Sequence, residues 1–105
     1  MAFADNLRQL PSIAHVKALE LRNRAGALIG TIENKPGSSG SVAVFAALAA
    51  GPEGIIDPAA AERGLAIYAE HTEDARAHPG KHPNIDRLFQ VMESGEPLYV
   101  TALTA

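Results

Sequence analysis

Cysteine is absent from the sequence and aromatic residues are scarce, with three Phe and two Tyr among 105 residues. Without cysteine, the chain cannot form disulfide bonds, zinc–thiolate sites or a thiol nucleophile. With so few aromatic residues, we expect a core of Leu, Ile and Val, with alanine surfaces where helices approach closely. The longest apolar run, residues 42–50, is far too short to cross a bilayer, so we expect no membrane partner.

An excess of positive charge is also missing. Nine Lys and Arg are scattered among twelve Asp and Glu, which gives a net charge of −3. A nucleic-acid-binding domain needs a basic surface that displaces counterions from phosphates, so we expect no nucleic-acid partner. The start of the chain, MAFADNLRQL, carries an acid at Asp5 and no long apolar stretch, which argues against a signal or transit peptide. We therefore predict a cytoplasmic protein.

What the sequence does contain is the composition of an ordinary globular domain. Apolar residues make up 47% of the chain and charged residues 20%. A chain of this length fits one hydrophobic core, so residues 1–105 are predicted to form a single domain.

The first half of the chain predicts a helix followed by a β-hairpin. Apolar residues recur at helical spacing over 3–10, and Pro11 follows. Extended runs cover 16–22 and 27–33. The four residues between them, 23–26, begin with Asn and end with Gly, which is typical of a hairpin turn.

The second half predicts three helices and a final strand. Ser39 or Ser41 can cap a helix that runs to about residue 50. Asp57 followed by proline predicts the start of a helix over 58–77. The clearest amphipathic pattern comes next, in a helix that Pro83 begins. Its predicted apolar stripe is Ile85, Leu88, Phe89 and Met92, and a strand is predicted over 98–103.

These elements predict an α+β fold in the order αββαααβ. The hairpin and the C-terminal strand would form a small three-stranded antiparallel sheet, packed with three to four helices. Both faces of the predicted strands carry apolar residues, whereas a half-exposed sheet normally alternates apolar with polar. Either the N-terminal helix or a second subunit must cover the other face, and we predict a homodimer.

Three segments in this order and spacing resemble a known family. They are AFADNLRQLPSI at 2–13, ENKPGSSGSVAVFAAL at 33–48 and AEHTEDARAHPGKHPNIDRL at 69–88. The chain is similar to the small bacterial proteins of the domain-of-unknown-function family 2322, and the HPGKHPNIDRL stretch is the most specific part. The resemblance implies a free-standing bacterial domain. It carries over no activity, substrate or catalytic residue.

A serine- and glycine-rich loop at 34–41 is the first candidate site. Glycines let backbone N–H groups approach an anion, serines add hydroxyl donors, and the following helix N-terminus favours negative charge. The spacing matches neither the Walker pattern nor the dinucleotide-binding fingerprint, and such loops also occur without a ligand. The candidate anion-binding residues here are Lys35, Ser38, Ser39 and Ser41.

A histidine cluster is the second candidate site. His71, Asp74 and His78 lie on roughly one face of the predicted helix, and the turn at 79–80 can fold His82 back toward them. Imidazoles beside a carboxylate suit a divalent metal or acid–base catalysis. They are also ordinary surface pairs, and a histidine in the last turn of a helix is favoured by the helix dipole.

The turn that follows the cluster is a third candidate. Lys81, His82 and Arg87 crowd polar groups around a rigid connection between two helices, where a ligand or a partner's backbone can be recognised. Capping of the next helix and solvation of the charged groups explain the same residues without a ligand.

Two classes of function follow from these sites. The first is a ligand-binding or protein-interaction module with a Ser/Gly-loop anion site, which would take a small anionic ligand or a protein partner. Its candidate ligand-binding residues are Lys35, Ser38, Ser39, Ser41, His78, Lys81, His82 and Arg87. The alternative is a small enzyme or metal-binding protein that uses His71, Asp74, His78 and His82. No cofactor is expected from any motif in the chain.

Overall fold

The structure is a computed structural model that describes residues 2–50 and 54–104. Within these residues, the chain forms five helices and four strands. In chain order they are α1 (Phe3–Leu7), β1 (Val16–Arg22), β2 (Leu28–Glu33), α2 (Ser39–Leu48), β3 (Ile55–Ile56), α3 (Pro58–Tyr68), α4 (Glu70–Ala77), α5 (Pro83–Ser94) and β4 (Leu98–Thr104). Each helix of the described residues is too short or too polar to cross a lipid bilayer.

The four strands form one antiparallel sheet in the order β2-β1-β4-β3. Strand β1 lies at its centre, where Leu19 is paired with Ile32 on one side and with Ala102 on the other. Strand β3 forms the second edge through the pairs of Ile55 with Tyr99 and Ile56 with Leu98. The hairpin and its partnership with the C-terminal strand are thus present as the sequence predicted.

The predicted three-stranded sheet and the element order αββαααβ are wrong in two places. Strand β3 adds a fourth strand, because the two residues Ile55 and Ile56 pair with β4 directly after Gly54. The helix predicted over 58–77 is divided at Ala69, whose φ of 53° and ψ of −115° place it outside helical geometry. The fold remains α+β, with a four-stranded sheet and five helices.

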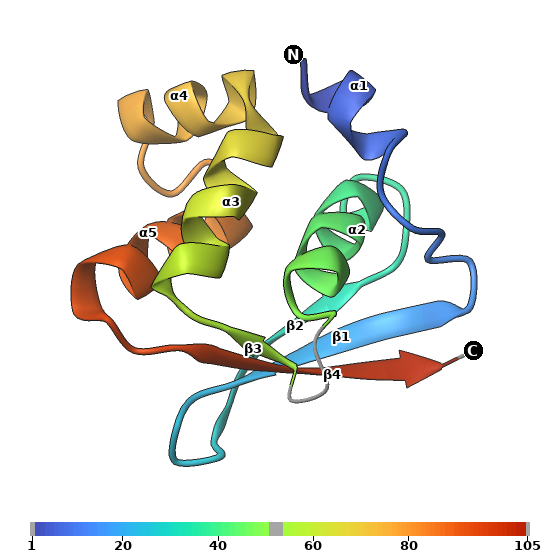
Figure 1. The fold of residues 1–105 in the computed structure, drawn as a ribbon, viewed down its shortest axis with the longest axis vertical. Coiled ribbons are helices and arrows are strands. Elements are labelled where there is room, and N and C mark those ends of the chain that lie inside the picture. The colour runs from blue at the N-terminus through green and yellow to red at the C-terminus, as the bar shows by residue number, and fades with distance from the viewer. Residues whose placement is uncertain (1, 51–53, 105) are drawn as a thin grey trace.

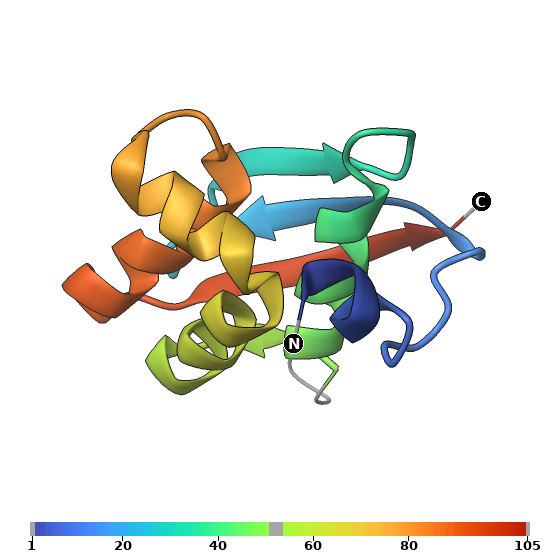
Figure 2. The same ribbon diagram turned by 90° about the horizontal axis from the view of Figure 1, so that it is seen from above.

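All five helices lie on the same side of the sheet (Figures 1 and 2). Helices α2, α3 and α5 pack on the sheet, while α1 and α4 lie farther from it. The core between them contains aliphatic side chains and Phe45, in agreement with the expected composition. Its largest fully buried members are Phe45, Leu19, Leu21, Ile56, Ile85, Leu88, Val42 and Val44. Burying each such side chain contributes about 1.5–3 kcal/mol.

Two local expectations had different outcomes. Asp57 caps α3 as predicted, since its side chain accepts a hydrogen bond of 2.8 Å from the N–H of Ala60, and Pro58 is the first helical residue. In α5, Ile85 and Leu88 of the predicted apolar stripe are buried. At the end of the helix, however, the buried residue is one position earlier than predicted. Val91 is buried and Met92 is 42% exposed.

The other face of the sheet is left uncovered by the described helices (Figure 1). The strand register places Leu28, Arg22 and Tyr99 in one row of this face, and Ala18 and Leu103 in another. Leu28 is 50% exposed and Leu103 37% exposed. The first explanation for the apolar second face, cover by the N-terminal helix, is therefore wrong, because α1 lies on the helical side.

Candidate functional site

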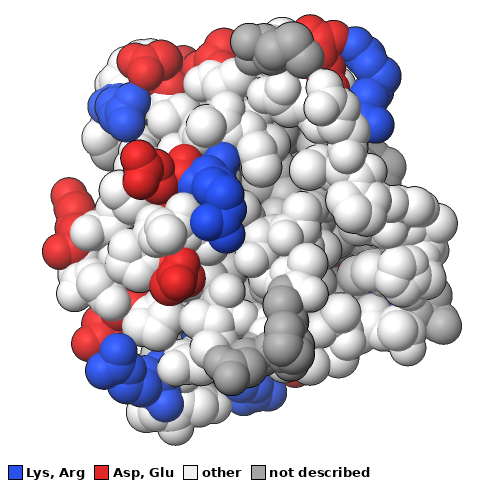
Figure 3. All heavy atoms as spheres, in the orientation of Figure 1, with Lys and Arg blue, Asp and Glu red and all other residues white. Residues whose placement is uncertain are grey.

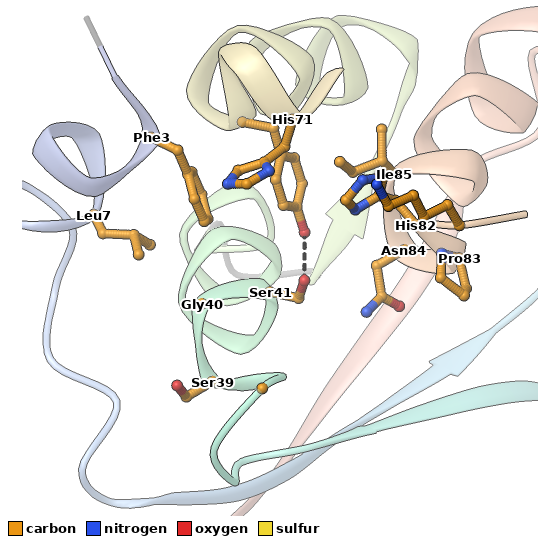
Figure 4. Close-up of a pocket in the computed structure, with 13 residues that line it drawn as sticks. Phe3, Leu7, Ser39, Gly40, Ser41, His71, His82, Pro83, Asn84 and Ile85 are labelled. Carbon is orange, nitrogen blue, oxygen red and sulfur yellow. Dashed lines mark hydrogen bonds between the residues drawn. The ribbon is translucent and has the colours of Figure 1, made fainter. Parts of the chain in front are cut away.

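A cavity of about 450 Å³ lies between α1, α2, the start of α4 and the turn that leads into α5 (Figure 4). One part of its wall is polar, with Ser39, Ser41, His71, Lys81, His82 and Asn84. The other part is aromatic or aliphatic, with Phe3, Leu7, Tyr68, Pro83 and Ile85. This volume is in the range typical of small-molecule sites, and the mixture of apolar surface with a few polar groups is typical of them too.

The serine side of the cavity is the first turn of α2. Because a helix leaves its first N–H groups without internal acceptors, Gly40 and Ser41 have free donors. In the described part of the chain, neither N–H has a hydrogen-bond acceptor. Gly40 also permits close packing, since an added Cβ would lie 3.3 Å from Cζ of Phe3. The start of α2 therefore presents backbone donors directly beside an aromatic ring.

Tyr68 links α3 to the first turn of α2 through a hydrogen bond. Tyr68 is 3% exposed, and its hydroxyl donates a hydrogen bond of 2.7 Å to Oγ of Ser41 (Figure 4). Burial raises the pKa of Tyr68 to about 12, although the hydrogen bond to Ser41 acts in the opposite direction. The phenol is therefore neutral at physiological pH and acts as a fixed donor. Because Ser41 accepts from Tyr68, its own O–H remains able to donate elsewhere.

Asp74 organises the histidine side of the cavity. Its Oδ2 lies 2.6 Å from Nε2 of His82 and 3.0 Å from Nζ of Lys81, and its Oδ1 lies 3.8 Å from Nε2 of His78. The hydrogen bonds from His82 and Lys81 lower the pKa of Asp74 to about 2. An ionised carboxylate only accepts hydrogen bonds, so Nε2 of His82 must carry the proton. Asp74 thus fixes both the position and the tautomer of His82.

His71 lies between the aromatic wall and His82. Its ring meets Phe3 edge-on with centroids 5.1 Å apart, and its centroid is 5.7 Å from that of His82. Phe3 in turn stacks on Tyr68 with centroids 5.2 Å apart. Figure 4 shows this row of rings along one side of the cavity. Residues from α1, α3, α4 and the α5 turn are therefore held together through their rings.

Four of the eight predicted ligand-binding residues line this one cavity. They are Ser39, Ser41, Lys81 and His82, and His71 of the alternative cluster joins them. The serine loop and the histidine cluster, predicted separately, are thus two sides of the same space.

The other four predicted residues lie elsewhere. Lys35 forms an exposed ion pair with Glu33, and the Ser38 hydroxyl donates to the carbonyl of Glu33. The His78 side chain is 63% exposed at the end of α4. Arg87 lies over Gly30 and donates to Asn84.

A family comparison agrees with the resemblance seen in the sequence. A family model described as an uncharacterized protein conserved in bacteria, DUF2322, matches residues 3–102. The chain belongs to the DUF2322 family. No curated protein matches the chain significantly, and no solved structure does either. Membership of the DUF2322 family identifies a conserved bacterial protein, and its description names no ligand or reaction.

In this DUF2322 protein, the apolar half of the cavity was missed by sequence reasoning. Phe3 and Leu7 were recognised only as the apolar side of a short helix, and that helix was considered as cover for the sheet. Their spacing of four residues places both on one helix face, which was the available signal. Tyr68 buries its ring in the core and places its hydroxyl at the edge of the core.

The histidine cluster of the DUF2322 protein is not arranged as a metal site. Among residues 2–50 and 54–104, no group of three or more His, Asp or Glu side chains is placed to hold one metal ion. His71 and His82 line the cavity, whereas Asp74 is occupied by Lys81 and His82. The arrangement instead provides hydrogen-bond donors and one carboxylate-oriented imidazole.

Proposed function

We propose that this DUF2322 protein binds a small anionic ligand in the cavity between α1, α2, α4 and the α5 turn. The observation that carries the proposal is the convergence of the serine side and the histidine side on one cavity of about 450 Å³. Segments that are 30 to 45 residues apart in the sequence supply its polar groups. A binding site needs such a set of converging donors inside an otherwise apolar hollow.

The sign of the ligand's charge follows from the groups in the wall. The wall contains N–H donors at Gly40 and Ser41, hydroxyl donors, two imidazoles and Lys81, but no Asp or Glu among its described residues. The chain as a whole carries twelve acids and a net charge of −3. A wall without carboxylates, at the start of a helix, favours a negative group over a positive one.

Charged residues elsewhere on the surface are mixed in sign. On the face shown in Figure 3, positive and negative side chains lie next to one another over α4 and α5, and much of the remaining surface is uncharged. An anion would therefore be attracted by the local donors of the cavity and not by a general positive field.

A second candidate function is supported by the Asp74–His82 pair. A carboxylate that orients an imidazole is a recurrent arrangement in general acid–base catalysis, and His82 lines the same cavity. The cavity would then hold an anionic substrate while the free nitrogen of His82 accepts or donates a proton. We rank this below simple binding, because no nucleophile contacts His82 in the described residues.

We also propose that the protein is a homodimer in the cytoplasm. The support for the dimer is the uncovered sheet face with its exposed Leu28 and Leu103. The support for the location is the composition of the chain alone.

Calorimetric titration with acetate, benzoate and inorganic phosphate tests the binding proposal. We expect saturable binding of at least one anion at about pH 7. Replacing Lys81 or His82 by Ala should weaken it about tenfold or more. Lys81→Ala removes the positive charge of the wall, and both changes leave the Asp74 carboxylate beside the cavity less neutralised.

Matched variants at exposed positions outside the cavity serve as controls. Lys17→Ala and His15→Ala remove the same side-chain types from exposed positions and should leave the affinity unchanged. The proposal is wrong if no anion saturates the protein, or if the control variants lose as much affinity as the cavity variants.

A further inference from the structure

We infer, building on the proposed anion site, that the ligand is a small monocarboxylate with an apolar body, such as an aromatic or branched short-chain acid. The inference concerns the class of anion. It separates an organic carboxylate from inorganic phosphate and from phosphate esters. Three features of the cavity carry it: a fixed apolar wall, a single positive side chain that Asp74 largely neutralises, and a size larger than an inorganic ion needs.

The apolar wall is held in place before any ligand arrives. Phe3 stacks on Tyr68 and meets His71 edge-on, and its backbone N–H donates a hydrogen bond of 2.8 Å to Oε1 of Glu70. Asn6 of the same helix donates through Nδ2 to the carbonyl of Ile67, at 2.9 Å. Two anchors therefore hold α1 at the cavity although α1 has no fully buried residue. A preorganised aromatic surface favours a ligand that covers it.

The polar and apolar walls face the same space. Leu7 and Phe3 lie beside Gly40, since an added Cβ at Gly40 would be 3.3 Å from Phe3 and 3.6 Å from Leu7. On the other side of the cavity, Pro83 and Ile85 lie next to His82 (Figure 4). A bound carboxylate at the start of α2 would place its organic part against these side chains. An inorganic ion would leave the same surface in contact with water.

The charge of the cavity suits one negative charge better than two. Lys81 is the one permanently charged residue of the described wall, and its Nζ lies 3.0 Å from the Asp74 carboxylate. Lys81 and Asp74 therefore largely cancel. Beside this pair, the wall offers the backbone N–H groups of Gly40 and Ser41 and the serine hydroxyls, which are uncharged donors. A phosphate ester with two charges would lose more hydration than these groups can replace.

The size of the cavity agrees with this class. A volume of about 450 Å³ is near the lower end of the range for small organic ligands and well above what a bare anion fills. A carboxylate with a single ring or a branched short chain fits this volume with its apolar part against the apolar wall.

Four probes that vary one property at a time test the inference. Benzoate carries the ring and one charge, acetate lacks the ring, benzamide lacks the charge, and phenyl phosphate adds a second charge. We expect benzoate to bind about tenfold or more tighter than acetate and benzamide, and tighter than phenyl phosphate, in calorimetric titrations.

A pair of Phe variants identifies the wall that is responsible. Phe3→Ala should weaken benzoate binding severalfold and leave acetate binding unchanged, because only benzoate uses the aromatic surface. Phe89→Ala is the matched control, since Phe89 belongs to α5 and contacts Arg76 of α4, outside this cavity. Circular dichroism establishes that each variant is folded. If Phe3→Ala is not folded, Phe3→Leu provides the same comparison with α1 retained.

The outcomes separate this inference from the proposed function. If phenyl phosphate or inorganic phosphate binds tightest, or if Phe3→Ala leaves benzoate binding unchanged, the monocarboxylate class is wrong while the anion site stands. If benzamide binds as tightly as benzoate, or if no probe binds, the anion site itself is wrong.

Discussion

Tyr68 and Ser41 show how single residues connect the core to the cavity. The ring of Tyr68 is buried among core residues, and its hydroxyl reaches Ser41 at the edge of the cavity. The hydroxyl groups of these two residues, one from α3 and one from α2, thereby form a hydrogen bond with each other at the edge of the apolar core. The same bond orients the Ser41 hydroxyl, so the core determines part of the binding surface.

This pair predicts a non-additive effect on stability. Ser41→Ala leaves the Tyr68 hydroxyl without its acceptor and should lower the free energy of unfolding by about 1 kcal/mol. Tyr68→Phe should cost a similar amount, and the double variant should cost clearly less than the sum of the two, because it leaves no unpaired group. Urea denaturation of the four proteins measures this cycle. Strict additivity would mean that the bond does not exist in solution.

Asp74 predicts a specific dependence on pH. Its folded-state pKa of about 2 lies below the ordinary value of 3.8, so the carboxylate stabilises the fold above about pH 4 and loses this contribution as the pH falls toward 2. In His82→Ala and in Lys81→Ala, the pKa of Asp74 should rise toward 3.8, because each variant removes a hydrogen-bond donor.

Carbon-13 NMR titration of the side-chain carboxyl groups measures this shift. His78→Ala is the matched control, and it should move the pKa of Asp74 little, since His78 lies 3.8 Å away and is 63% exposed. A pKa of Asp74 near 3.8 in the unaltered protein would contradict the described geometry.

At the scale of elements, the sequence predicted those helices and strands that are marked by hydrophobic periodicity or by turn and cap residues. The hairpin, the capped start of α3 and the amphipathic helix α5 each have a local signal of several residues, and all are present. Strand β3 has no such signal, because two residues show no periodicity and only the neighbouring β4 makes them a strand. The break between α3 and α4 falls at Ala69, and alanine favours helix, so tertiary packing overrides local preference there.

The candidate site was predictable to a similar degree. The sequence identified the serine–glycine loop and the histidine cluster as candidate sites, and residues of both line the cavity. Their convergence was not visible, because it depends on how α2 packs beside α3 and how α4 turns at Ala69. Lys35 was predicted as part of the serine–glycine loop and Arg87 as part of the turn between two helices, and their side chains are engaged elsewhere.

The junction at Ala69 yields a stability prediction with a matched control. Its positive φ of 53° is in a region that favours glycine, at a cost of about 1–3 kcal/mol for other residues. Ala69→Gly should therefore raise the free energy of unfolding by about 1 kcal/mol after the entropic cost of glycine. Ala66→Gly, at an exposed position within α3, should lower it by about 0.5–1 kcal/mol. Destabilisation by both changes would contradict the break between α3 and α4.

At the scale of the whole molecule, one face of the sheet carries all the helices and the other face is open. The helices on this face and the four-stranded sheet enclose one core, and the cavity lies among the helices on the side away from the sheet (Figures 1 and 4). The open face and the cavity are therefore separate surfaces. Association through the sheet would leave the cavity accessible.

This separation predicts how the proposed dimer responds to mutation. Light scattering after size-exclusion chromatography should give twice the mass of one chain, and Leu28→Lys together with Leu103→Lys should reduce it to one. Anion affinity should be the same in both states. A monomeric unaltered protein would contradict the homodimer, and it would leave the binding proposal intact.

The central claim is that anions bind between the start of α2 and the histidine side of the cavity. Mapping of backbone amide shifts by NMR during a benzoate titration tests it most directly. We predict that the amides of Gly40, Ser41, His71 and His82 shift together with one saturation curve, while the hairpin turn at 23–26 is unaffected. Shifts confined to other surfaces, such as that around Arg87, or an absence of saturable shifts, would contradict the claim.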